Sequence, residues 1–409
     1  MMKKIKIWYY ILFVCTAVFV LRWNEIFDSL LLVKSFLLLL ISSKINSESI
    51  FTFEVYDQIF SILFLIAIAI ITITKRNKWK YLTIPINANR AVLITLIFIF
   101  IEAPMIAPFN PNLQMNLSAA NKLKPLSSIF LVENNISSKY NKNEIDEYLF
   151  IKNKILREYV DDNYYLTDSM PIVENENISV SRIIFLFGTD EYGRDLFSRI
   201  VYSTRLSLLI GLGAVFVTFI IGSMLGFIAG YGGKFIDSLL SRFSEMFLAV
   251  PTIFLVILFL AAFGNSLWNV ILVLGLASWM NLFKIVRGEV QLIKAKNFIQ
   301  TSKQLGLSNF RIFTKDILPH LMPALINLVF LFANVIIAES SLSFLGLTGN
   351  HFYPSWGVII DEGQYYLRQA WWISFFPCMM IVITLLTFYN FGRSLQLRFN
   401  PFIKNKLSS

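Results

Sequence analysis

Long apolar runs separated by shorter polar segments dominate this chain. Several of these runs approach the roughly 20 residues that cross a bilayer as a helix. Hydrocarbon cannot satisfy exposed backbone polar groups, so apolar runs of this length are helices. We interpret as spans the runs near 6–22, 57–74, 90–108, 205–230, 243–263, 267–286, 321–346 and 372–392. The pattern therefore predicts an all-α membrane protein, a polytopic helical bundle with about eight transmembrane helices.

The first 84 residues are the hardest to place. Residues 29–41 are apolar but short, and Lys34 lies in their middle. If they spanned, the basic segment 75–80 would lie outside, against the positive-inside rule. We favour an interfacial or re-entrant segment, and a true span is the alternative. The first run begins like a signal peptide, but residues 20–23 offer no small-residue cleavage site, so we expect a retained anchor.

Composition and charge agree with a membrane protein. Of the 409 residues, 56% are hydrophobic and only 15% are charged, far from a soluble average. The net charge of +10 could indicate nucleic acid, but the basic residues flank spans on one side, which is typical of positive-inside topology. We therefore predict no nucleic-acid partner and cytoplasmic termini. Cys15 and Cys378 both lie within apolar runs and imply no disulfide framework.

A basic, amphipathic stretch at residues 286–319 separates two apolar runs. Its apolar residues recur at helical spacing. Leu305-Gly306 followed by Ser308 predicts a helix that ends at glycine and a second helix that is capped by serine. Pro319 then ends the second helix. Two short helices joined by a sharp turn form a knob suited to a groove on a soluble partner.

This stretch resembles the cytoplasmic coupling loop of binding-protein-dependent ABC importer permeases. Gly306 and Ile317-Leu318-Pro319 match the pattern of that loop, whereas Gln300-Thr301-Ser302 stand where it has Glu-Ala-Ala. Two further segments resemble the oligopeptide/dipeptide permeases within this group. The first is Gly188-Thr189-Asp190 with Gly193-Arg194-Asp195, which we call the GTD motif; the second is Glu339 to Gly346, followed by Pro354-Ser355-Trp356-Gly357.

The resemblance covers about residues 85–401 and implies a domain organisation around a six-helix permease core. It gives an N-terminal membrane region with extra spans (1–84), a first core span (85–108), an extracytoplasmic insert (109–187), the permease transmembrane domain (188–401) with its coupling loop (287–319), and a cytoplasmic tail (402–409). The location implied is the bacterial cytoplasmic (inner) membrane, as a multi-pass protein.

The same resemblance implies partners. They are a second homologous permease subunit, two ATP-binding-cassette ATPase subunits, an extracytoplasmic substrate-binding protein and membrane lipid. The chain has no phosphate-binding P-loop, so we expect it to bind no cofactor and to be no enzyme, with ATP and Mg used by the partner ATPases. His320 and His351 lack ligand spacing, so no metal site and no catalytic residue are predicted.

Candidate functional residues fall into three groups. In the coupling loop, Phe310 and Phe313 are the expected apolar anchors for the ATPase. In the GTD motif, Asp190 or Asp195 should cap a helix that starts near Leu196. The full sets are Gln300, Thr301, Ser302, Gly306, Ser308, Phe310, Phe313 and Pro319 for the coupling loop, Gly188, Thr189, Asp190, Gly193, Arg194 and Asp195 for the GTD motif, and Glu339 alone.

We expect Phe197, Ile200 and Val201 of the capped helix to lie in the membrane interface, with Arg199 and Arg205 facing outward. A carboxylate within a span must face the protein or a cavity. Glu339 is then either a pathway residue or a buried hydrogen-bonding anchor, and the anchor is favoured. Glu102 is expected at the interface. Gly211, Gly213, Gly222, Gly226 and Gly230 indicate close helix packing.

The insert is either a loosely ordered connector or a small subdomain that contacts the binding protein, and we expect a helix around 143–160. The function predicted is that of a permease subunit that forms the translocation path for peptides or a related small solute. The alternative is an ion-coupled secondary carrier or a structural membrane protein without transport. A carrier should show inverted repeats and paired intramembrane charges, whereas Glu339 stands nearly alone.

Overall fold

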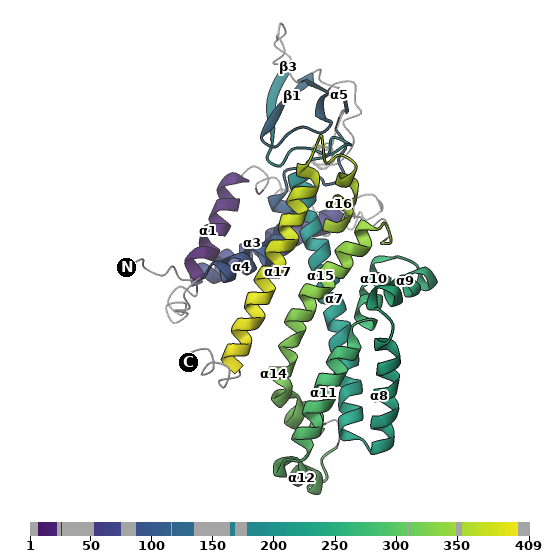
Figure 1. Ribbon diagram of the computed structural model, residues 1–409. Helices are drawn as coiled ribbons and strands as arrows, with labels where there is room; N and C mark the ends of the chain where they lie inside the picture. The colour runs from purple at the N-terminus through teal and green to yellow at the C-terminus, as the bar shows by residue number, and fades with distance from the viewer. Residues whose placement is uncertain are drawn as a thin grey trace, which may run out of the picture. The chain divides into compact units, whose positions relative to one another are not determined.

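The computed structural model describes residues 7–22, 26, 53–74, 87–115, 117–134, 164–167, 178–308, 311–348 and 354–399 (Figure 1). The chain divides into two compact units. Unit 1 comprises Met1–Arg205 and Tyr353–Met379, and unit 2 comprises Leu206–Phe352 and Met380–Ser409. Two long helices, α7 (Leu196–Tyr231) and α17 (Trp372–Phe399), contribute residues to both units.

Unit 1 joins helices to a small sheet. Its helices are α1 (Ile7–Leu21), α3 (Phe53–Thr74), α4 (Ala88–Ile106), α5 (Leu117–Ala120) and α16 (Trp356–Gln364). Unit 2 contains α8 (Lys234–Leu248), α9 (Thr252–Phe263), α10 (Leu267–Leu276), α11 (Trp279–Lys294), α12 (Asn297–Gln304), α14 (Met322–Leu325) and α15 (Asn327–Phe344). The predicted all-α membrane class is confirmed for the bundle.

Among the described residues, four helices are long and apolar enough to cross a membrane, or up to six if each bent pair is one span. The four are α4, α7, α15 and α17. The predicted total of about eight spans stays a prediction, and residues 29–41 lie outside the described part of the chain.

Two expected spans are bent rather than straight. Helices α8 and α9 meet at 90°, and α10 and α11 meet at 42° (Figure 1). The expectation of one continuous helix over 243–263 is therefore wrong. Pro251 lies at the bend and begins α9, and a proline has no backbone N–H and disfavours helical conformation in the residue before it. At the second bend, two side-chain hydroxyls donate hydrogen bonds to backbone carbonyls near the end of α10. Thr218 Oγ1 donates to Gly275 O at 3.0 Å, and Ser278 Oγ donates to Leu274 O at 2.8 Å.

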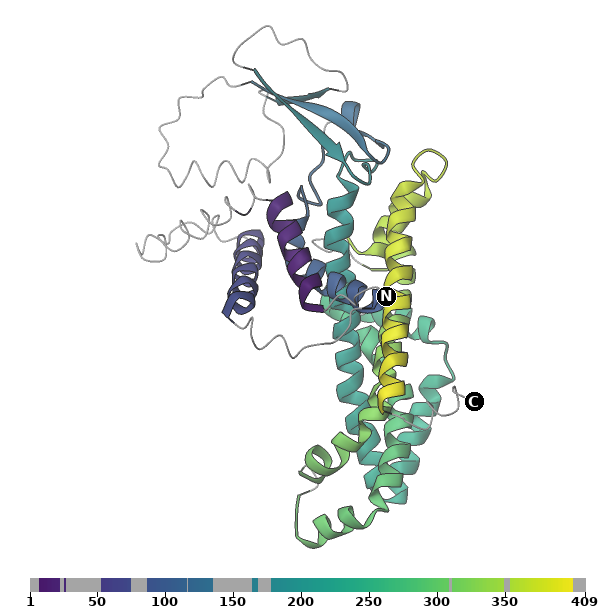
Figure 2. The ribbon, with the colours of Figure 1, turned by 90° about the vertical axis from the view of Figure 1, so that its left-hand side faces the viewer.

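The insert contains a three-stranded antiparallel sheet that the sequence analysis missed (Figure 2). Strand β1 (Ser127–Asn134) lies between β2 (Tyr164–Thr167) and β3 (Ile178–Phe185), and Ile129 is opposite Ile183. Ile129 and Phe185 are buried with Leu113 and Met115, so the described part of the insert has an apolar core. The helix expected around 143–160 lies outside the described residues.

The glycines of α7 allow other helices to approach closely, as the sequence predicted. A Cβ on Gly226 would lie 2.8 Å from Val286 Cβ, and one on Gly230 would lie 2.8 Å from Arg287 O, both of α11. Gly211 and Gly213 lie similarly against side chains of α15 and α10, and Gly222 lies against Leu282. Small residues therefore set the spacing of α7 and α11.

This packing gives a matched test in two helical glycines. Gly226→Ala should lower thermal stability, because its methyl group would clash with α11. Gly288→Ala, also within a helix, has no atom within 4 Å of the added Cβ. It should be neutral or stabilising by up to about 1 kcal/mol, because alanine favours a helix over glycine. Thermal unfolding in detergent measures both; equal effects would contradict the packing account.

Candidate functional site

The GTD motif folds into one compact turn at the start of α7. Gly188 and Gly193 have φ of +81° and +69°, a backbone conformation that side chains rarely adopt. A Cβ on Gly188 would lie 2.3 Å from Leu123 O, and one on Gly193 would lie 3.1 Å from Met115 O. Conformation therefore requires both glycines and space also requires Gly188, and both let the motif pack against the segment before β1.

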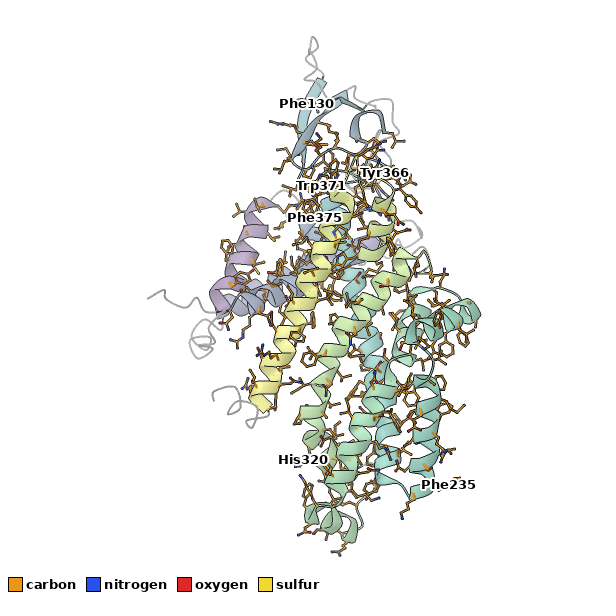
Figure 3. The ribbon with its side chains drawn as sticks, viewed as in Figure 1. Phe130, Phe235, His320, Tyr366, Trp371 and Phe375 are labelled. Carbon is orange, nitrogen blue, oxygen red and sulfur yellow. The ribbon has the colours of Figure 1, made fainter. Side chains whose placement is uncertain are left out.

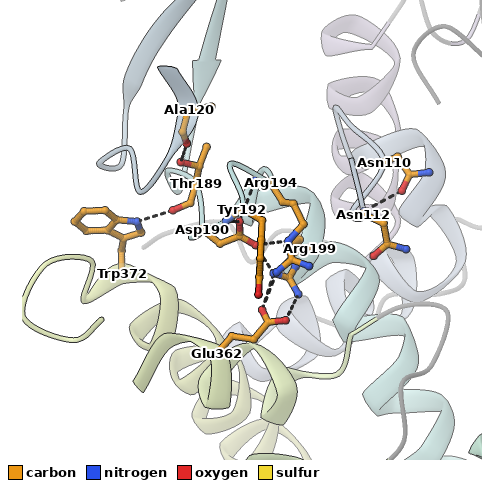
Figure 4. Close-up of polar contacts among 10 residues, drawn as sticks. All are labelled: Asn110, Asn112, Ala120, Thr189, Asp190, Tyr192, Arg194, Arg199, Glu362 and Trp372. Carbon is orange, nitrogen blue, oxygen red and sulfur yellow. Dashed lines mark hydrogen bonds and ion pairs between the residues drawn. The ribbon is translucent and has the colours of Figure 1, made fainter. Parts of the chain in front are cut away.

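Thr189 joins this turn to two other parts of unit 1. Its buried Oγ1 donates to Ala120 O at 2.5 Å and accepts from Leu123 N at 2.8 Å. Trp372, the first residue of α17, donates from Nε1 to Thr189 O at 3.2 Å (Figure 4). One threonine thus binds both the insert and the beginning of α17.

Asp190 organises the charges of the motif. Its Oδ1 accepts the backbone N–H groups of Tyr192 and Arg194, each at 2.9 Å. Its Oδ2 accepts from Arg194 Nε at 2.6 Å and pairs with the guanidinium of Arg199 on α7 (Figure 4). One carboxylate therefore shapes the loop and also holds a cation on the helix.

Glu362 of α16 completes an ion network. Its carboxylate accepts from Arg199 at 2.7 and 3.2 Å and from Arg194 at 3.1 Å. The Arg199 side chain is only 1% exposed. Trp356, from the Pro-Ser-Trp-Gly motif, is fully buried at the first position of α16 and fixes the helix that carries Glu362. Two motifs that are far apart in the sequence thus meet through Arg199.

Asp195 caps α7, as predicted. Its Oδ2 accepts from Ser198 N at 2.8 Å and from Ser198 Oγ at 2.6 Å. Burial raises the pKa of the Asp195 carboxyl to about 6, although the hydrogen bonds from Ser198 and Phe197 lower it. Because this pKa is raised above the unfolded value, the contribution of the group to stability is full below about pH 4 and is lost as the pH rises through the folded-state value.

The expected orientation of the first turns of α7 is wrong. Arg199 does not face outward but is buried in the ion network. Arg205 reaches α3 and forms an ion pair there. Ile200 and Val201 are each 3% exposed rather than at a membrane interface, and Val201 packs against α4. A buried arginine needs a carboxylate, and that requirement makes this helix face inward.

The coupling segment, residues 287–319, begins as the sequence predicted. Helix α12 ends before Gly306, whose φ is +74°, and Leu307 N donates to Ser302 O at 3.3 Å. Ser308 Oγ then accepts from Arg311 N at 3.4 Å. The following π-helix, Ile312–Ile317, ends before Pro319, and the chain continues as a 3-10 helix, Leu318–Leu321. Phe310 lies outside the described residues.

The inner face of this segment is packed onto its own unit. Ile299 and Ile312 are buried with Val286 and Val290 of α11. Phe313 packs on the same cluster, and its ring centroid is 4.6 Å from that of Phe227 on α7. Phe313 is therefore partly buried against this chain, and its role as an anchor for the ATPase stays a prediction.

Polar contacts hold the same region of unit 2. Arg287 of α11 pairs with Asp237 of α8, and its Nη2 donates to Asp237 Oδ2 at 2.8 Å. Lys294 Nζ donates to Tyr231 O at 2.6 Å at the end of α7. A cation at a helix C-terminus satisfies free carbonyls and favours the helix dipole. Helices α7, α8 and α11 are thus tied together next to α12.

Glu339 lies in a hydroxyl-rich cluster at the end of α15. Its Oε1 accepts from Ser343 Oγ at 2.8 Å, and Ser343 Oγ accepts from Thr348 at 2.8 Å. Gly346, with φ of +68°, follows the helix end. The contacts favour the anchor interpretation over a pathway residue. The described residues contain no group of three or more His, Cys, Asp or Glu that could hold a metal ion.

Comparison with known proteins relates this sequence to a family of transport proteins. Residues 222–405 match the family described as "Binding-protein-dependent transport system inner membrane component". The chain is 39% identical over 217 residues to the "Dipeptide transport system permease protein DppC" of Bacillus subtilis (strain 168), a match that covers 53% of this chain and 68% of that protein. It is 32% identical over 248 residues to the "Oligopeptide transport system permease protein OppC" of Haemophilus influenzae, covering 59% and 76%.

The chain belongs to this permease family. It is an ABC importer permease, a multi-pass inner-membrane subunit of a transporter complex that includes ATPase and substrate-binding partners. Among solved structures it is similar to the "MetNI methionine ABC transporter" in an inward-facing conformation, with 18% identity, a TM-score of 0.40, and coverage of 50% of this chain and 97% of that chain.

Three residues of this permease were missed from the sequence: Arg199 as a network centre, Glu362 and Trp372. An arginine among Leu196, Phe197 and Ile200 was a usable signal, because a cation on an apolar helix turn requires a carboxylate. The identity of that carboxylate was not accessible, because Glu362 lies 163 residues away.

The network predicts a large effect for one substitution. Arg199→Met should destabilise the permease by roughly 3–5 kcal/mol, because it removes the buried one of the two guanidinium groups that balance Asp190 and Glu362 and leaves Arg194 alone to pair with both carboxylates. Arg182→Met is the matched control: Arg182 is exposed on β3, and its Nε donates to Ser128 Oγ at 2.9 Å. It should cost less than about 1 kcal/mol. Membrane yield and detergent unfolding temperature report both, and similar losses would argue against the network.

Proposed function

We propose that this permease imports peptides or a chemically related small solute, and that the coupling segment transmits ATPase motion to the spans. The names of its relatives support the substrate class. The observation that carries the coupling proposal is the packing of α12 and the π-helix onto α7 and α11. A segment packed in this way moves with those helices when a partner displaces it.

The turn after α12 is an exposed part of the coupling segment. Leu305 is 75% exposed, and Gln304 and Gly306 beside it are exposed as well. Leu305 is therefore a more accessible candidate than Phe313 for the apolar anchor in an ATPase groove. No atom lies within 4 Å of a Cβ built on Gly306, so its positive φ, and not crowding, requires the glycine.

The assembly proposed contains a second homologous permease, two ATPase subunits and an extracytoplasmic binding protein. The coupling segment and both termini lie on the cytoplasmic side in this proposal, because the basic residues flank the spans there. The ATPase subunits use ATP and Mg, and the permease itself hydrolyses none. Closure of the ATPases then switches the spans between inward- and outward-facing states as rigid bodies.

The binding protein is proposed to dock on unit 1 near the GTD motif. Tyr365 and Trp371, which lie between α16 and α17, are 77% and 51% exposed. Tyr366, labelled with Trp371 in Figure 3, lies beside them. The ammonium group of Lys122 is 4.3 Å from the centroid of its ring. Aromatic residues that expose both apolar and polar atoms are enriched in protein interfaces.

Family membership leaves the secondary-carrier alternative without support.

Reconstitution tests the transport function. We expect liposomes that contain this permease with its partner permease, ATPases and binding protein to take up labelled dipeptides or oligopeptides only when ATP is present. The permease alone should show no ATP hydrolysis and no uptake. Uptake by the single chain driven by an ion gradient would instead establish a carrier.

A pair of exposed leucines tests the coupling surface. Leu305→Ser should weaken capture of the ATPase subunits by roughly tenfold, the scale of an interface hot spot. Leu292→Ser on α11 is the control, because Leu292 is 68% exposed but lies outside the α12 turn. Co-purification at matched expression measures capture. Normal capture by Leu305→Ser would remove this turn from the interface.

A further inference from the structure

Glu102 is a buried carboxyl group that the transport mechanism does not use. It lies in α4, where its own backbone departs from helical geometry (φ −101°, ψ 19°), two residues before Pro104. The residue is 0% exposed; its expected place at the membrane interface stays a prediction. Within the described parts of the chain, neither carboxyl oxygen has a hydrogen-bond partner. An ionised carboxylate in such a place would be strongly disfavoured.

The neighbouring charges do not compensate for an ionised Glu102. Arg205 of α7 is near enough to attract it, but Arg205 Nη1 donates to Asp57 of α3. Asp57 is itself only 7% exposed. One guanidinium thus faces two carboxyl groups, and the pair of Arg205 with Asp57 is already neutral. If Glu102 were ionised, the cluster would carry one uncompensated negative charge.

The other polar side chains near Glu102 do not compensate its charge either. From α1, Cys15 is close enough to interact with it electrostatically but carries no positive charge. Arg22, just after α1, donates to Met105 O at 3.3 Å and to Ala107 O at 3.0 Å. From α3, Ser61 Oγ donates to Ile101 O at 3.1 Å. The polar groups of α1 and α3 therefore bind the carbonyls of α4 and leave its carboxyl group unpaired.

We propose that Glu102 is a proton-binding site beside the ion pair between Asp57 of α3 and Arg205 of α7. The proton binds one carboxylate oxygen and makes the cluster electrically neutral. A metal cation is a poorer occupant, because it takes several oxygen ligands and the described residues include no group of three or more candidate ligands.

The bound proton makes this packing depend on pH. An unfolded chain releases the glutamate proton near about pH 4.3, whereas in this proposal the folded protein keeps it to higher pH. The folded state therefore binds one more proton than the unfolded state over that interval. Stability must then fall as the pH rises. Glu102→Gln, which resembles the protonated acid, should remove this dependence.

Dicyclohexylcarbodiimide, an apolar reagent, tests the site in membranes that contain the full chain. The carboxyl oxygen adds to the carbodiimide carbon, and the acid proton moves to nitrogen; the adduct then rearranges to a stable N-acylurea. A carboxylate does not supply that proton. We expect peptide mass spectrometry to find Glu102 labelled at about pH 7 and Asp57 unlabelled, with labelling that falls about tenfold per unit once the proton is lost at higher pH.

The variant Asp57→Asn is the most informative test of the charge balance around Glu102. It frees Arg205, which can then pair with Glu102 and favour the carboxylate, so labelling at neutral pH should fall severalfold although an acid has been removed. Glu102→Gln is the negative control, and membrane yield shows whether either variant folds. Absence of wild-type Glu102 labelling, or stabilisation by sodium without any pH dependence, would overturn the proton site.

Discussion

The guanidinium of Arg199 is the interaction on which the arrangement of unit 1 depends. It lies in the first turn of α7 and is bound by Asp190 from the GTD motif and by Glu362 from α16. Removing such a charge from water is costly, so it is tolerated only with its partners in place. The loop, the beginning of α7 and α16 must therefore fold together. This requirement explains why the GTD and Pro-Ser-Trp-Gly motifs occur in one chain.

Local features of the fold were readable from the sequence, and distant partners were not. The Asp195 cap, the turn at Gly306 and the glycine face of α7 depend on neighbouring residues or on side-chain size. The partner of Arg199 and the inward position of Phe313 depend on packing between remote segments. Strands β1 and β3 were missed because β1 shows no regular alternation of apolar and polar residues and its pairing partner lies far along the chain.

The coupling segment combines a rigid inner face with an exposed turn. The buried isoleucines fix the inner face to α11, and Lys294 fixes α11 to the end of α7. A close-packed interface of this kind transmits displacement with little loss, because protein interiors have low compressibility. The turn at Leu305 and Gly306 carries few such contacts and is open to a partner.

The 90° bend between α8 and α9 has a consequence for the lipid around the permease. Helix α9 has 12 residues. At about 1.5 Å per residue it is roughly 18 Å long, too short to cross the hydrocarbon layer alone. The first amides of α9 have no intrahelical acceptor, and Pro251 supplies no side-chain cap. Acyl chains offer no hydrogen bonds, so protein or water must line this corner wherever it lies within the hydrocarbon layer.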